Sequence, residues 1–391
     1  MTSYTLKVTV PADLIIPARS AAELVEILSW DGTRPATFSA SEFPVDVVRL
    51  DGSASPPIAV ARSRRAETLK AFPATLRQRA QAAFDRASRT GPKMPLGPGR
   101  SLDLSAPPIA MGVINVTPDS FSDGGIHYET SSAVASALAM FDAGAAVVDV
   151  GGESTRPSTY GESAAVSAEQ EIRRVVPVIE ELRRKTDLPI SVDTRKASVA
   201  REAVAAGADI VNDVSALRHD PNMAQAVSET GAAVILMHMK GDDPRTMQED
   251  TSYGHPIADI ARELAAAADR ALGAGIPAEK IAVDPGLGFG KSPEGNLVLL
   301  RYLAAFRSLG FPLAAGASRK AFVRRFSGVG ETASTAERLP GSLASLAAAA
   351  AAGAALVRVH DVTESVRFLR MLRAIETPAA ALARPAGVTA P

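Results

Sequence analysis

Short runs of apolar residues recur along the second part of the chain, and four of them follow a glycine. Four such runs form a weak repeat: AGAAVVDV (143–150), AGADIVND (206–213), TGAAVILM (230–237) and AGAALVRV (352–359). The glycine stands where a helix would end, and the run behind it has the length of a strand. Because Val, Ile and Leu follow one another without polar alternation, we predict strands that are buried on both faces, as in a parallel sheet with helical crossovers.

Eight strands of this kind are predicted, each followed by a segment that can form a helix. They lie near residues 109–115, 146–150, 190–192, 210–212, 234–237, 281–283, 312–315 and 356–359. Eight βα units match the size of a closed (β/α)8 TIM barrel of about 250 residues, so we predict this α/β fold. A doubly wound open sheet is the alternative. Its usual glycine-rich first turn does not match the first turn here, NVTPDSFSDGG.

The residues before the barrel read as a small α+β N-terminal domain over 1–95, in which we find no site chemistry. Within it the pattern predicts strands near 5–10, 45–50 and 58–62 and helices over 21–28 and 67–87. Residues 96–108 are rich in Pro and Gly, contain the hairpin-like SLDL and predict a linker. The barrel is predicted over 109–378, and a flexible Ala/Pro tail over 379–391.

Charge and composition exclude several classes of protein. The 391 residues include 42 Lys and Arg against 43 Asp and Glu and no Cys, and the formal net charge is −1. This balance supplies no general field for a nucleic acid or an anionic membrane, and without Cys there are no disulfides or thiolate nucleophiles. The longest apolar stretch, near 346–357, is shorter than the roughly 20 residues that span a bilayer, and MTSYTLKVTV does not resemble a secretion signal. We expect a cytoplasmic protein without nucleic-acid or membrane partners.

Polar residues stand at the predicted strand ends, which in a barrel form one shared mouth. The first subset of these residues is Asp193, Asn212, Asp284 and Lys320. Their carboxylates, amide and ammonium suit a flat heterocycle with several N–H groups and a carbonyl. Taken singly, each Asp could instead cap the helix that follows it.

The second subset is Asn115, Arg358 and His360, with Ser318 and Arg319 at the start of a helix. Cationic groups together with free N–H groups favour an anion such as a phosphate or a carboxylate. Asn115 could also add a neutral oxygen ligand to Mg²⁺, which usually keeps several waters and bridges phosphate oxygens.

Two further features are weighed against simpler explanations. The stretch GLGFGKS (286–292) resembles a phosphate-binding loop, but the required first glycine falls on Pro285, so no Walker motif is present. We expect Gly residues there to allow close backbone approach and Phe289 to form an apolar wall. His238 lies in an apolar run, where a structural role is more common than a catalytic one.

Eight motifs, in order along the chain, together resemble the dihydropteroate synthase family. They are MGVINVTPDSFSDGG (111–125), VDVGGESTRPS (148–158), SVDTRK (191–196), IVNDVSAL (210–217), LMHMKGDDPRTMQ (236–248), DPGLGFGK (284–291), GASRKAFV (316–323) and RVHDV (358–362). The resemblance covers residues 100–376 and leaves out residues 1–95. It implies a Mg²⁺-dependent homodimeric transferase. The reaction joins (7,8-dihydropterin-6-yl)methyl diphosphate to 4-aminobenzoate and gives 7,8-dihydropteroate and pyrophosphate.

The resemblance also assigns roles to residues of this chain. The pterin would be held by Asp193, Asn212, Asp284 and Lys320, in a slot lined by Met237 and Gly316. The diphosphate would be held by Asn115, Thr155, Arg358 and His360, with Asn115 on the metal. The 4-aminobenzoate pocket would comprise Phe121, Asp123, Arg156, Pro157, Phe289, Ser318 and Lys320. The catalytic groups among these would be Arg358, His360, Lys320, Asp123 and Arg156.

The family covers its site with two mobile loops, which match 116–125 and 152–160 here. Ser158 departs from the usual STRPG of the second loop. We expect a dissociative substitution at the pterin CH2, because the anion-binding groups would stabilise the leaving diphosphate and the electron-rich pterin would stabilise the cation. Three alternatives share part of this pattern: a pterin-binding methyltransferase domain, a paralogue without turnover, and an enzyme that takes a modified arylamine.

Overall fold

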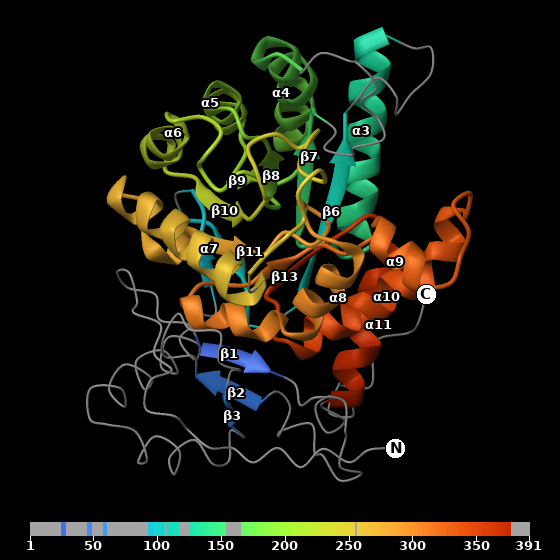
Figure 1. Ribbon diagram of the computed structural model, residues 1–391. Coiled ribbons are helices and arrows are strands. Elements are labelled where there is room, and N and C mark those ends of the chain that lie inside the picture. The colour runs from blue at the N-terminus through green and yellow to red at the C-terminus, as the bar shows by residue number, and fades with distance from the viewer. Residues whose placement is uncertain are drawn as a thin grey trace.

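Eight parallel strands form one sheet, and helices surround it (Figure 1). The computed structural model describes residues 93–97, 99–105, 108–116, 125–153, 166–254 and 256–376 and, before them, only the strands at 25–28, 45–48 and 58–60. The strand order is β11-β10-β9-β8-β7-β6-β13-β12, and a parallel bridge between Val283 and Leu313 joins the two ends. The sheet therefore closes, and the prediction of a TIM barrel is confirmed.

The strands of the barrel lie where the apolar runs predict them. They are β6 (Ile109–Asn115), β7 (Val147–Gly151), β8 (Ile190–Asp193), β9 (Ile210–Asp213), β10 (Ala233–Met237), β11 (Ile281–Asp284), β12 (Ala314–Ala315) and β13 (Leu356–Val359). The described helices are α3 (Gly125–Asp142), α4 (Ala168–Lys185), α5 (Ala197–Ala205), α6 (Met223–Thr230), α7 (Pro256–Gly273), α8 (Pro293–Arg301), α9 (Ala321–Phe326), α10 (Thr335–Ala351) and α11 (Val362–Glu376), with short 3-10 segments η5 (Ala278–Lys280) and η6 (Leu303–Leu309). No helix among these residues is long and apolar enough to cross a membrane.

The repeat glycines end the helices that precede the strands. Gly231, at the end of α6, has φ 69°, and Gly353, after α10, has φ 79°. A residue with a side chain is strained in this left-handed region, which explains why glycine stands there. Five residues after three of these glycines come Asp149, Asn212 and Arg358, so the repeat places these side chains at equivalent levels of their strands.

A short hairpin fills the amino-terminal end of the barrel. It consists of β4 (Lys93–Pro95) and β5 (Ser101–Asp103), paired antiparallel. Its apolar side chains are buried in one cluster with the first residues of the barrel strands; the hairpin side of this cluster is Met94, Leu96, Leu102 and Leu104. The first strand of this hairpin lies at the end of the predicted domain 1–95 and the second lies in the predicted linker 96–108, and the hairpin as a whole packs into the barrel. The boundary of the domain before it stays a prediction.

One prediction for the first 95 residues is wrong. Residues 25–28, expected in a helix over 21–28, form strand β1 (Val25–Leu28), which pairs antiparallel with β2 (Val45–Val48). The sequence VEIL has β-branched residues that favour a strand once a partner strand is present. The strands expected near 45–50 and 58–62 are confirmed as β2 and β3 (Ile58–Val60). β1 lies against η6. The strand expected at 5–10, the helix at 67–87 and the tail at 379–391 lie outside the described residues.

Candidate active site

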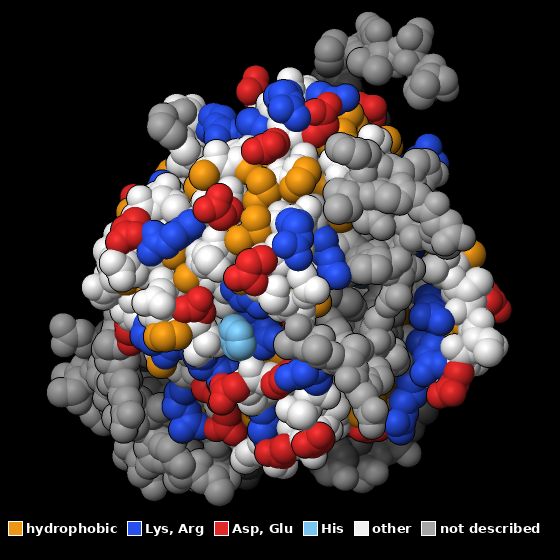
Figure 2. All heavy atoms as spheres, turned by 90° about the horizontal axis from the view of Figure 1, so that it is seen from above, with side chains coloured by type: hydrophobic (Ala, Val, Ile, Leu, Met, Phe, Trp, Pro, Cys, Tyr) orange, Lys and Arg blue, Asp and Glu red, His pale blue; other side chains and the backbone are white. Residues whose placement is uncertain are grey.

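The carboxyl ends of the strands meet at one end of the barrel. β6 and β7 point upward in Figure 1, and Figure 2 views the molecule from above, where acidic and basic side chains gather around a histidine. Asp193 ends β8, Asn212 lies in β9, and Asp284 ends β11. Burial raises the pKa of Asp193 to about 7, against the effect of Arg358, and also raises the pKa of Asp284. The structure thus places two desolvated carboxylates and a buried amide on one rim.

Arg358, in β13, reaches the same rim. Its Nε–H donates to Asp149 Oδ2 at 2.6 Å, and its Nη2 donates to Asp193 Oδ2 at 2.8 Å. Burial alone would lower the pKa of Arg358, but Asp149 and Asp193 outweigh it and raise this pKa. The anion-binding and pterin-binding subsets of the sequence analysis are therefore in direct contact through this guanidinium.

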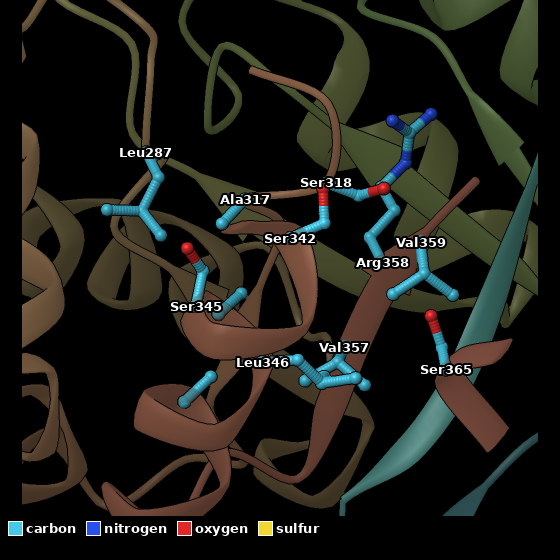
Figure 3. Close-up of a pocket in the computed structure, with 12 residues that line it drawn as sticks. Leu287, Ala317, Ser318, Ser342, Ser345, Leu346, Val357, Arg358, Val359 and Ser365 are labelled. Atoms are coloured by element: carbon cyan, nitrogen blue, oxygen red, sulfur yellow. The ribbon is translucent and has the colours of Figure 1, made fainter. Parts of the chain in front are cut away.

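Ser318 and His360 lie next to Arg358. The main-chain N–H of His360 donates to Ser318 Oγ at 3.2 Å, and His360 Nδ1 lies 3.3 Å from the same oxygen. Figure 3 shows the Ser318 side chain beside Arg358, above a small cavity that three further serines help to line. Gly316 packs on this group, since a Cβ there would lie 3.3 Å from Arg358 Cβ. Asn115, at the end of β6, is half-buried.

Lys320, which follows β12, reaches the loop that follows the neighbouring strand β11. Its Nζ donates to Leu287 O and lies 4.5 Å from the centroid of the Phe289 ring. Burial lowers the pKa of Lys320 to about 7, and Asp284 partly offsets this effect. A Cβ on Gly288, whose φ is 82°, would lie 2.8 Å from Lys320 Cδ, so the absence of a side chain lets the lysine pass. Met237 ends β10 and is buried.

Comparisons with known proteins agree with this geometry. The family model of the pterin binding enzymes matches residues 111–360. The chain is 46% identical over 276 residues to the dihydropteroate synthase of Escherichia coli (strain K12), which covers 71% of this chain and 94% of that protein. The chain belongs to the dihydropteroate synthases. The resemblance seen in the motifs is confirmed, and the chain is an enzyme of the transferase class.

Solved dihydropteroate synthases have the same fold. The structure of the Xanthomonas albilineans enzyme with 4-aminobenzoic acid superposes with a TM-score of 0.66 at 44% identity and covers 73% of this chain and 99% of that one. The structure of the same enzyme in complex with 7,8-dihydropteroate has a TM-score of 0.64 at 41% identity, with the same coverage. Family membership disfavours the pterin-binding methyltransferase as an alternative.

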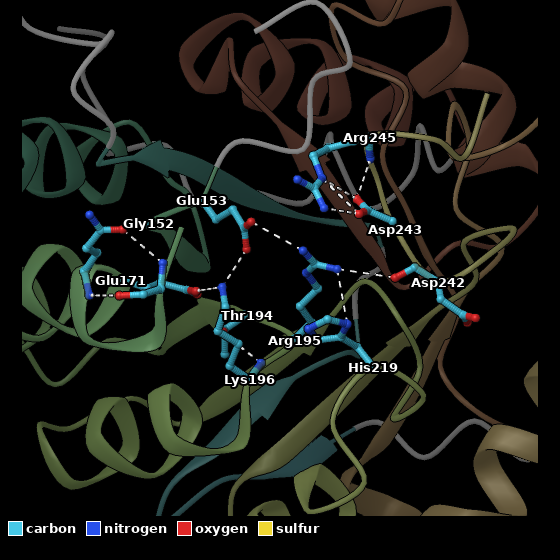
Figure 4. Close-up of polar contacts among 12 residues, drawn as sticks. Gly152, Glu153, Glu171, Thr194, Arg195, Lys196, His219, Asp242, Asp243 and Arg245 are labelled. Carbon is cyan, nitrogen blue, oxygen red and sulfur yellow. Dashed lines mark hydrogen bonds and ion pairs between the residues drawn. The ribbon is translucent and has the colours of Figure 1, made fainter. Parts of the chain in front are cut away.

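A second charged cluster, which the sequence did not predict, lies beside the site (Figure 4). Lys196 Nζ contacts Glu171 Oε2 and, at 2.7 Å, Glu153 Oε2; Arg195 Nη2 lies 3.4 Å from Glu153 Oε1. Glu171 is 1% exposed, and burial raises its pKa although Lys196 opposes this effect. One signal was present in the sequence: Glu171 lies four residues before Val175 on the buried stripe of α4.

Buried Lys291, in the loop after β11, contacts buried His238, which follows β10. Lys291 Nζ donates to His238 O at 2.9 Å and lies 2.8 Å from His238 Nδ1. Burial and Lys291 lower the pKa of His238 to about 4, and burial lowers the pKa of Lys291 well below its usual value. Both residues therefore hold the backbone beside Asp284, which agrees with a structural role for His238.

Five of the residues assigned by resemblance lie outside the described residues: Phe121, Asp123, Thr155, Arg156 and Pro157. The same holds for Ser158 and for most of the two loops at 116–125 and 152–160. Their roles stay predictions.

Proposed function

We propose that this chain condenses (7,8-dihydropterin-6-yl)methyl diphosphate with 4-aminobenzoate to form 7,8-dihydropteroate and pyrophosphate. The observation that carries the proposal is the rim on which Arg358 contacts Asp193, beside Asn212 and Asp284. Support also comes from the relatives, since the Xanthomonas albilineans enzyme has been solved with 4-aminobenzoic acid and in complex with 7,8-dihydropteroate.

The pterin would lie against the acceptors of β8, β9 and β11. Asp193 and Asp284 would accept its N–H groups, Asn212 would offer its amide, and Lys320 would donate to a ring acceptor. Met237 and Gly316 would line the slot. Burial raises the pKa of both carboxyl groups and so favours their neutral forms. Hydrogen bonds from the pterin N–H groups would oppose this effect and favour the ionised forms.

The diphosphate would lie toward Arg358 and His360, with Ser318 between them. Two bonds to carboxylates use two of the five N–H groups of Arg358, so its guanidinium has donors left for the leaving group. Thr155 and Asn115 would complete this subsite. As the CH2–O bond breaks, the electron pair leaves with the diphosphate, and these donors would stabilise its charge.

The residues at the end of β6 suit a metal that arrives with the substrate. Asn115 offers one amide oxygen, and the described residues include no group of three acidic or histidine side chains that could hold a metal alone. Mg²⁺ fits this donor set because it keeps waters and binds through substrate phosphates. We propose that Asn115 holds Mg²⁺, which when bound neutralises negative charge on the diphosphate.

4-Aminobenzoate would attack from the side of Phe289, Lys320 and Ser318, with Phe121, Asp123, Arg156 and Pro157 completing its pocket. We propose a dissociative course, in which the pterin CH2 becomes cationic before the neutral amine nitrogen forms the new C–N bond and loses a proton.

We also propose that the protein is a homodimer, and sedimentation of the purified protein tests this.

The experiment that tests the function measures pyrophosphate and dihydropteroate with Mg²⁺, the pterin diphosphate and 4-aminobenzoate. The matched pair is Arg358→Ala against Arg184→Ala, since Arg184 is exposed and pairs only with Glu181 among the described residues. We expect Arg358→Ala to lose on the order of 10²-fold in turnover, as when one charge-stabilising donor is removed, and Arg184→Ala to keep wild-type turnover. Unchanged turnover in Arg358→Ala would refute its role, and no product from the wild type would refute the function.

A further inference from the structure

Asp149 is a buried carboxylate that no role described above uses. It lies in β7, its side chain is inaccessible to solvent, and its Oδ2 accepts from both Arg358 Nε, at 2.6 Å, and Asn212 Nδ2, at 3.0 Å. Its Oδ1 has no hydrogen-bond partner among the described residues. A buried carboxylate without full pairing is costly, so its position here calls for an explanation.

The three residues form one layer inside the barrel. β13, β7 and β9 are alternate strands in the sheet order, and alternate strands supply each interior layer of a TIM barrel. Such layers are usually made of Val, Ile and Leu. Here Asp149 stands between Arg358, two strands away on one side, and Asn212, two strands away on the other.

Contact with Asp149 restricts the orientation of both neighbours. Arg358 is held by Nε on Asp149 and by Nη2 on Asp193, so two carboxylates on different strands fix the plane of its guanidinium. A carboxylate can only accept, so the amide nitrogen of Asn212 must face Asp149. The amide oxygen of Asn212 is then turned away from Asp149 and is available as an acceptor for a ligand N–H.

We propose that Asp149 is a positioning residue for the condensation, which fixes the Arg358 guanidinium toward the diphosphate and the Asn212 amide oxygen toward the pterin. The inference rests on the proposed function, and wild-type turnover in the same assay tests that function separately. Loss of a residue that orients a metal ligand commonly lowers activity 10- to 100-fold, and we expect a loss of that order here, because Asp149 orients its two partners in the same way.

The test compares Asp149→Asn with Asp213→Asn. Asp213 is equally buried and ends β9, but its side-chain contacts are with Ser215 and Leu217 of its own loop. Steady-state kinetics with the pterin diphosphate and thermal unfolding are measured for both variants. We expect kcat/KM to fall about 10- to 100-fold in Asp149→Asn and to stay within about twofold in Asp213→Asn.

A double variant shows whether Asp149 acts through Arg358. Asp149→Asn added to Arg358→Ala should lower kcat/KM by a smaller factor than Asp149→Asn does in the wild type, because the part of its effect that acts through Arg358 is already lost and only the part through Asn212 remains. Wild-type kinetics in Asp149→Asn, an equal loss in Asp213→Asn, or full additivity in the double variant would overturn the proposal. If Asp149→Asn does not fold, Asp149→Glu, which keeps the charge but moves it by one methylene, is judged by the same three comparisons.

Discussion

Lys196 offers a sharp test of how this barrel holds buried charge. Its ammonium is the shared partner of two carboxylates, with contacts to Glu171 and, at 2.7 Å, to Glu153. The exposed fractions of these side chains are 14% for Lys196, 12% for Glu153 and 1% for Glu171. The substitution Lys196→Met keeps most of the side-chain volume and leaves both acids without this partner.

The expected loss follows from this burial. Removing one partner of a buried ion pair costs about 3–5 kcal/mol, because an unpaired charge stays behind. Lys185→Met is the matched control, since Lys185 pairs with Glu181 at 3.1 Å with side chains 47% and 34% exposed. Such a surface pair contributes about 0–1 kcal/mol. The large difference between the two lysines is therefore a consequence of burial, not of the ion-pair distance.

The assay is urea unfolding followed by circular dichroism at pH 6 and pH 8. Burial already raises the pKa of Glu171, and loss of Lys196 raises it further. A folded pKa above the unfolded value of about 4.3 means that the folded state takes up a proton, so the deficit of Lys196→Met should shrink as pH falls. Adding Glu171→Gln should recover part of the loss. Equal losses in Lys196→Met and Lys185→Met would refute the reasoning.

Three further predictions concern the site and the barrel floor. In Gly286→Ala the new Cβ would clash with the main-chain carbonyl of His238, and φ at this position is 68°. The variant should therefore bind the pterin more weakly in calorimetry and unfold more easily. Gly231→Ala is the control: φ is 69° but no atom lies within 4 Å, so its stability should fall by only about 1 kcal/mol. Pterin affinity should fall as pH drops through about 7, where Asp193 protonates, and Asp193→Asn should abolish this dependence. Leu102→Ala, in the buried hairpin, should cost about 2–5 kcal/mol in urea unfolding, whereas exposed Leu188→Ala should change stability by about 0.5 kcal/mol or less.

The barrel could be predicted because its signal is local and repeated. Each predicted strand is a short apolar run, and four of the eight runs follow a glycine that ends the preceding helix. The helix expected over 21–28 failed for the opposite reason. The strand at Val25–Leu28 depends on pairing with Val45–Val48, and no pattern within the first segment encodes that partner.

The sequence predicts which residues lie at the ends of the strands, but it does not predict the contacts between them. Polar residues at strand ends, such as Asp193 and Asp284, could be found by position alone. The ion pair between Arg358 and Asp193 could not, because it depends on where two strands far apart in sequence lie around the closed sheet. For the same reason the sequence did not predict that Glu171 and Lys291 belong to the surroundings of the site. Each is a buried charged side chain, and burial is a property of the fold.

In the proposed reaction, the electrostatics of the rim would let one site bind both the pterin and the diphosphate. Burial moves the pKa of Asp193 up to about 7 and the pKa of Lys320 down to about 7, so near neutral pH neither group holds its charge firmly in the free enzyme. A pterin N–H that donates to Asp193 would favour the carboxylate, and a diphosphate nearby would favour the ammonium of Lys320. Each substrate group would thus create the charge that binds it, while Arg358, fixed by Asp149 and Asp193, stays cationic throughout.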